Sequence, residues 1–115
     1  INIEWYKMLK YLMIFFISFE LKAYDENDLL KLNNTNICLN CDLSNADLGG
    51  KNLKGSNLQG STLKGSILIG TDLSYSNLLE VNLTSAFIRS TNFCNTIMPD
   101  GEKSIEGCSN IEIQK

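Results

Sequence analysis

The chain has 115 residues, of which ten are basic and thirteen acidic, so its formal net charge is −3. This length holds one domain. Histidine is absent, which excludes a histidine-based catalytic triad, an imidazole general base and histidine metal ligands. The basic residues are scattered, and a nucleic-acid-binding protein would carry them as a patch.

The N-terminal region predicts an export signal. Residues 1–7 show no pattern of regular structure, and we expect Met8 to be the true start, so that they are an upstream read-through. The apolar run at residues 11–19 is shorter than the roughly twenty residues of a membrane-spanning helix and fits the core of a signal peptide. We therefore interpret residues 1–23 as read-through plus a helical signal peptide, cleaved after Ala23. The mature protein would then be periplasmic or secreted; the alternative is a membrane anchor formed by an uncleaved N-terminus.

A short helix is predicted over residues 24–34, which read YDENDLLKLNN. Asp25 can serve as the N-cap, and further acidic residues fall in the first turn, where the helix dipole favours negative charge. Leu29, Leu30 and Leu32 supply an apolar face, and the two asparagines suit a C-terminal stop. Residues 24–37 thus form a helix and a linker.

A period of five residues dominates the chain from Cys41 to Asp100. A large apolar residue occupies the same place in twelve successive repeats, a small residue often lies two places before it, and glycine lies two places after it in five repeats. The large apolar positions are Leu43, Leu48, Leu53, Leu58, Leu63, Leu68, Leu73, Leu78, Leu83, Ile88, Phe93 and Met98.

This period matches neither the 3.6 residues of a helix nor the two of a strand. Residues two apart share a side in an extended chain, so the large and the small residue of each repeat can both point inward. Glycine at the following position tolerates a positive φ, and Asn or Asp beside it can hydrogen-bond nearby backbone. A chain that turns the same way every five residues winds into a solenoid.

The run ADLGGKNLKGSNLQGSTLKGS resembles the pentapeptide-repeat family. The resemblance implies an all-β fold, a right-handed, four-sided parallel β-helix in which about twenty residues make one coil. Residues 38–100 would then form about three coils, with residues twenty apart directly above one another and the large apolar side chains in four core ladders. Solenoid ends need caps, so the helix at residues 24–34 is expected to cover the first coil.

Two exceptions to the pattern stand out within the repeats. Lys51 occupies an inward position, and we expect its stem to pack inside while the ammonium leaves through the capping region; a catalytic lysine is the alternative. On the outside, Ile67, Ile69 and Phe87 gather on one face as a candidate interaction patch. Cover by the chain's own tail or helix is the competing explanation for that patch.

The tail, residues 101–115, is polar and is expected to be loosely held. Four cysteines behind a signal peptide favour two disulfides, with Cys38 paired to Cys41 and Cys94 to Cys108, each stapling one end of the coil. Free buried thiols and metal or redox chemistry at the C-x-x-C spacing are the alternatives. A single zinc site is geometrically poor, because two or more coil heights, roughly 10 Å or more, separate the pairs.

These patterns predict a non-enzymatic, exported scaffold or protein-interaction module without a cofactor or a metal. A filled column has flat walls rather than a pocket, and the outward Asp42, Asp47 and Asp72 are interpreted as corner residues that bond their own backbone. The expected partner is an unidentified protein or a second copy of the chain, and contact with a membrane is expected only through an uncleaved N-terminus. The alternative is a DNA mimic that modulates a topoisomerase, as the resemblance implies for some members. Such mimicry needs a long acidic rod, whereas this coil is short and nearly neutral.

Overall fold

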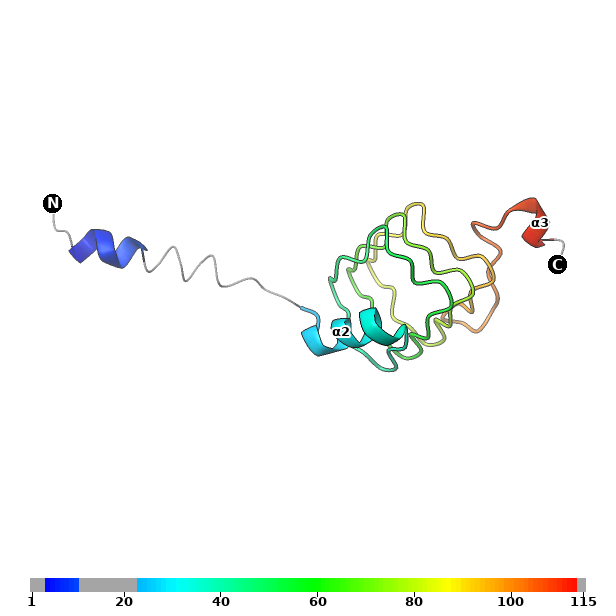
Figure 1. Ribbon diagram of the computed structural model, residues 1–115, viewed down its shortest axis with the longest axis horizontal. Coiled ribbons are helices and arrows are strands. Elements are labelled where there is room, and N and C mark those ends of the chain that lie inside the picture. The colour runs from blue at the N-terminus through cyan, green and yellow to red at the C-terminus, as the bar shows by residue number, and fades with distance from the viewer. Residues whose placement is uncertain (1–3, 11–22, 114–115) are drawn as a thin grey trace.

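The computed structural model describes residues 4–10 and 23–113 (Figure 1). Residues 4–10 are helical, α2 spans Glu26–Thr35 and α3 spans Asn110–Ile113. The expectation that residues 1–7 lack regular structure is therefore wrong for residues 4–7. The predicted signal-peptide core at residues 11–19 lies outside the described residues. Within the described ranges, no helix is both long and apolar enough to cross a membrane.

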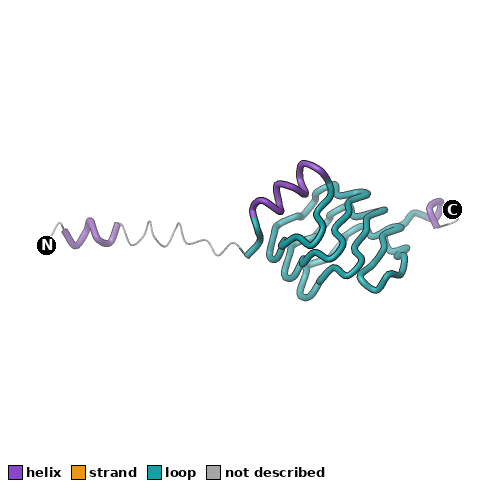
Figure 2. The backbone as a smooth tube through the Cα atoms, turned by 90° about the horizontal axis from the view of Figure 1, so that it is seen from below, coloured by secondary structure: helices purple, strands orange, loops and turns teal. Residues whose placement is uncertain are grey.

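Stacked coils make up the body of the protein (Figure 2). Parallel β-bridges join residues that are twenty apart, and they fall into four columns. We name each column by one of its members: the Asn57 column (Ile37, Asn57, Asn77, Ile97), the Thr62 column (Asp42, Thr62, Asn82), the Ile67 column (Asp47, Ile67, Phe87) and the Asp72 column (Asn52, Asp72, Asn92). In the described part of the chain these bridges stay isolated and no extended strand forms. Each side of a coil therefore contributes a single bridged residue to its column.

The same three backbone hydrogen bonds recur from one coil to the next. The N–H of Leu63 donates to the carbonyl of Asn82 over 2.8 Å, the N–H of Gly65 to that of Thr84 over 2.9 Å, and the N–H of Thr62 to that of Cys41 over 2.9 Å. One coil therefore donates to the next at its inward and corner residues, and to the previous one at the residue before the inward one. This pattern satisfies backbone groups that the burial of the coil removes from water.

Every fifth residue from 40 to 95 has a left-handed backbone, with φ between 54° and 72°. Glycine occupies five of these corners, as the sequence pattern indicates. Tyr75, Glu80, Ser85 and Ser90 adopt the same conformation without glycine, at φ between 58° and 60°. The turn is thus a property of the five-residue repeat, and glycine only lowers its cost.

The inward large residues form one continuous core. Leu43, Leu48, Leu58, Leu63, Leu68, Leu73 and Leu78 are fully buried, and Leu53 and Phe93 are nearly so. Leu83 and Met98 are only partly buried. The prediction that Ile88 completes a core ladder is wrong, because its side chain is 47% exposed. Among residues 23–113, no further coil lies beyond Ile88 to cover the end of its ladder.

The small inward residues contribute hydroxyl groups that bond to backbone inside the column. The Ser61 hydroxyl donates to the Cys38 carbonyl over 2.6 Å and accepts the Cys41 N–H over 2.9 Å. The Thr71 hydroxyl donates to the Leu48 carbonyl over 2.8 Å. In contrast, the hydroxyl oxygen of Ser66, although buried, has no partner within the described structure. Hydrogen bonds from buried hydroxyl groups therefore help to hold the interior together, but not every small inward residue makes one.

Helix α2 covers the N-terminal end of the stack. Asp25 is its N-cap and accepts the N–H groups of Asn27 and Asp28, as the sequence predicts. Leu32 is buried in the core cluster. In later coils the equivalent N–H, that of Thr62, donates to the preceding coil. The N–H of Asp42 donates instead to the Asp28 carboxylate of α2 over 2.8 Å.

The tail covers part of the opposite end. Ile97 and Lys103 form an antiparallel bridge. The N–H of Phe93 donates to the Glu106 carbonyl over 3.1 Å, and that of Asn95 to the Ser104 carbonyl over 2.8 Å. The expectation of a loosely held tail is thus wrong for residues 102–106, because these backbone bonds tie the segment to the last coil.

Candidate functional site

The two predicted disulfides are present, one at each end of the coil. Cys38 and Cys41 are joined at an S–S distance of 2.02 Å with a Cα–Cα distance of 5.6 Å. Cys94 and Cys108 are also joined, with a Cα–Cα distance of 4.7 Å. The first bond fixes the entrance of the chain into the coil, and the second ties the tail to the last coil.

A potential metal cluster lies beside the first disulfide. Ligand atoms of Asp28, Cys38 and Cys41 lie within 4.8 Å of one another. The two sulfurs are bonded to each other, and the Asp28 carboxylate accepts the Asp42 N–H. A thiolate is the form of cysteine that binds metal, and in the disulfide neither sulfur is a thiolate. The arrangement therefore acts as a structural link between α2 and the first coil.

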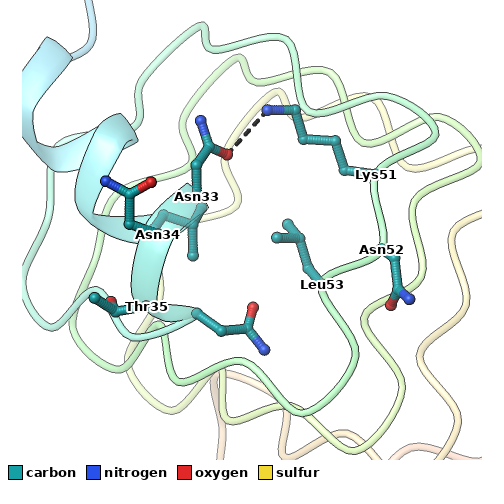
Figure 3. A pocket seen from close by; sticks show the side chains of 8 residues that line it. Asn33, Asn34, Thr35, Lys51, Asn52 and Leu53 are labelled. Carbon is teal, nitrogen blue, oxygen red and sulfur yellow. Dashed lines mark hydrogen bonds between the residues drawn. The ribbon is translucent and has the colours of Figure 1, made fainter.

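A pocket of about 410 Å³ opens between the end of α2 and the first coil (Figure 3). Leu32 and Leu53 contribute apolar surface to it, and asparagine side chains contribute amides. The Lys51 ammonium donates to the Asn33 side-chain oxygen over 3.0 Å. This geometry confirms that the lysine leaves the inward position toward the capping helix, where a positive charge is favourable near the helix C-terminus.

The outward acidic residues bond to their own corners. The carboxylates of Asp42, Asp47 and Asp72 each accept the N–H of the residue two places on, over 3.1, 3.0 and 2.9 Å respectively. Asn52 and Asn82 accept in the same way. The sequence-based interpretation of these aspartates as corner residues is confirmed, and they do not converge on a common site.

The predicted interaction patch lies on the Ile67 column. Ile67 and Phe87 form a β-bridge and so stack directly. Phe87 is 58% exposed and Ile69 is 46% exposed, whereas Ile67 is only partly exposed. Ile88 directly follows Phe87 and adds an exposed apolar side chain that the five-residue period assigned to the core. The exposed apolar surface thus extends to the C-terminal end of the stack.

These features define a class of protein, a solenoid whose chain turns a corner every five residues and stacks on itself every twenty. Residues 37–74 and 68–98 match the family described as Pentapeptide repeats, in eight copies. The matched residues make up more than half of the sequence, and the chain belongs to the pentapeptide repeat family. This membership implies a right-handed β-helix.

Several solved pentapeptide repeat proteins are similar to this chain. Rfr23 from the cyanobacterium Cyanothece 51142 is 32% identical over 52% of this chain and 42% of its own, with a TM-score of 0.39. HetL from the cyanobacterium Nostoc sp. strain PCC 7120, described as involved in regulation of heterocyst differentiation, is 29% identical over 59% of this chain and 40% of its own, with a TM-score of 0.36.

The protein alr5209 from Nostoc PCC 7120 is 22% identical over 55% of this chain and 69% of its own, with a TM-score of 0.30. This chain therefore spans less than half the length of Rfr23 and HetL. A comparison with curated proteins gives no match.

Proposed function

We propose that this protein is a non-catalytic interaction module whose right-handed, four-sided coil presents the Ile67 column to a protein partner. The observation that carries the proposal is the apolar strip on one side of the stack, in which Phe87 stacks on the partly exposed Ile67 and the exposed Ile69 lies two residues further along. Exposed apolar side chains that stack on a rigid support are typical of contact surfaces. The support is rigid because each coil is bonded to its neighbours at every corner.

The proposal also places the protein outside the reducing cytoplasm, in the periplasm or secreted. Two disulfides support this location, since such bonds persist in oxidising compartments and are rare in the cytosol. Intact mass spectrometry of the protein purified from cell fractions tests it. Two disulfides remove four hydrogen atoms, so a mass lower by that amount than the mass of the reduced chain is expected in the envelope or the medium. A reduced cytoplasmic form would contradict the proposed location.

Crosslinking and capture from the envelope fraction test the contact surface. Phe87→Asp places a charge in the centre of the strip and should abolish capture of the partner. Asn82→Asp is the matched control, because it adds the same charge to the same coil on the Thr62 column, opposite the neutral Thr62, while keeping the side-chain oxygen that accepts the Thr84 N–H. Capture that survives Phe87→Asp, or that is lost equally with Asn82→Asp, would argue against the Ile67 column.

A further inference from the structure

The C-terminal end of the stack is only half covered. Residues 102–106 lie over the last members of the Asp72 and Asn57 columns, whereas no segment of the described residues is bonded over the ends of the Thr62 and Ile67 columns. Within the described residues, four N–H groups of this open half have no hydrogen-bond partner, although their counterparts one coil earlier all donate to the next coil. The open donors are Leu83, Ser85, Ile88 and Ser90, and the paired counterparts are Leu63, Gly65, Leu68 and Gly70.

Apolar surface accompanies these unpaired groups. Ile88 occupies an inward place in the five-residue frame but is 47% exposed. The neighbouring Phe87 is exposed as well, and Leu83 is only partly buried. An open β-edge of this kind is a template for pairing with another chain. The open half therefore has the properties of an interface.

The tail shows which geometry this end accepts. It runs antiparallel to the last coil, and Glu102, Ser104 and Glu106 bond to that coil through their backbone. In an antiparallel ladder the intervening residues direct their N–H and C=O groups the other way. The backbone N–H and C=O of Lys103 and the N–H of Ile105 accordingly have no partner within the described residues. The covered half ends in a free edge of its own.

The end of the stack is therefore a step. One half is raised by the tail segment and the other half lies one layer lower. We propose that two copies of this chain associate end to end about a two-fold axis, with the tail segment of each copy on the open half of the other. A two-fold axis makes the two contacts identical. The raised tail segment of each copy therefore covers the lower, open half of the other copy.

The charges on the two halves are complementary. Arg89 is the one charged residue among residues 81–90 of the open half, whereas the tail segment 102–106 contains Glu102 and Glu106 against Lys103. The proposed arrangement places the acidic segment of one copy against the basic half of the other. Opposite charges across an interface favour the correct register and suppress others. The association uses Ile88 and the backbone edge at the end of the stack, whereas the partner surface proposed above lies on the side of the stack, and the two surfaces share Phe87.

Sedimentation velocity of the full chain over a wide range of concentration tests this proposal. The oxidised protein should sediment as a dimer that dissociates on dilution. Ile88→Asp should give a monomer at all concentrations. Ile69→Asp is the matched control, because Ile69 is 46% exposed, nearly the same as Ile88, but lies one coil away from the end; this variant should dimerise like the unmodified protein. Circular dichroism shows whether each variant remains folded.

Hydrogen exchange provides a readout that does not depend on substitution. The amides of Leu83, Ser85, Ile88 and Ser90 should exchange fast in dilute protein and become protected as the dimer forms. Three results would overturn the proposal: a monomer at every concentration, a dimer that survives Ile88→Asp, or a dimer that Ile69→Asp dissociates, which would place the contact on the side of the stack. Protection of the same amides in a monomer would also overturn the proposal, because the end of the stack would then be covered within a single chain.

Discussion

The substitutions Leu68→Ala and Ile88→Ala probe two positions of the same five-residue frame in very different surroundings. Leu68 is fully buried between coils, and Ile88 is 47% exposed one coil later. Removing a buried leucine side chain costs about 2–5 kcal/mol, which includes the cavity it leaves, and the enclosed position of Leu68 suggests about 3 kcal/mol. For Ile88 about half of the burial term is present and no closed cavity forms, so we expect about 1 kcal/mol.

Urea unfolding of the oxidised protein, followed by circular dichroism, measures both changes in the free energy of unfolding. Dilute protein is needed, so that association at the C-terminal end does not add to the apparent stability. The denaturant slope should remain the same in both variants, which would show that the midpoints report stability. Equal losses for Leu68→Ala and Ile88→Ala would refute the reasoning, because they would mean that the end of the ladder is closed.

Three further predictions concern the interior, a corner and the tail. Ser61→Ala should lower the free energy of unfolding by about 1–3 kcal/mol because it leaves a buried N–H unpaired, whereas Ser66→Ala should be neutral or stabilising; a loss at Ser66 equal to that at Ser61 in thermal unfolding would contradict the assignment of these bonds. Glu80→Gly should raise the melting temperature, since glycine relieves a left-handed residue of about 1 kcal/mol of strain, and an unchanged or lower melting temperature would count against it. Replacing Cys94 and Cys108 by serine should cost about 3 kcal/mol in the chain-entropy model and shift dimerisation to higher concentration; unchanged sedimentation would show that the tail is held without the disulfide.

The sequence predicts the interior of the stack well, because each repeat is a local unit. A leucine every fifth residue, with a small residue two places before it, sets the inward side without reference to distant parts of the chain. The bridges between residues twenty apart follow once four repeats make a coil, which the family resemblance supplied. The direction of the Lys51 side chain also follows from the sequence, because an inward lysine beside a capping helix can place its ammonium in solvent only at that end of the stack.

The ends could not be predicted from the repeat, because they depend on segments outside it. The pattern assigns Ile88 to the core, but its burial requires a covering layer, and the tail supplies this layer over two columns only. Residues 101–106, which are polar apart from Gly101 and Ile105, show no pattern that indicates an antiparallel pairing with the last coil. The left-handed backbone of Tyr75 and Glu80 could not be predicted from these residues themselves, since neither residue type favours a positive φ.

Amide-to-amide nuclear Overhauser effects in the isotope-labelled protein test the central claim, that residues twenty apart stack as successive coils. The account predicts cross-peaks from the neighbourhood of Thr62 to those of both Asp42 and Asn82. The Leu63 methyl groups should in turn show contacts to Leu43 and Leu83. Contacts at any other constant spacing, or a Leu63 with solvent contacts in place of these neighbours, would contradict it.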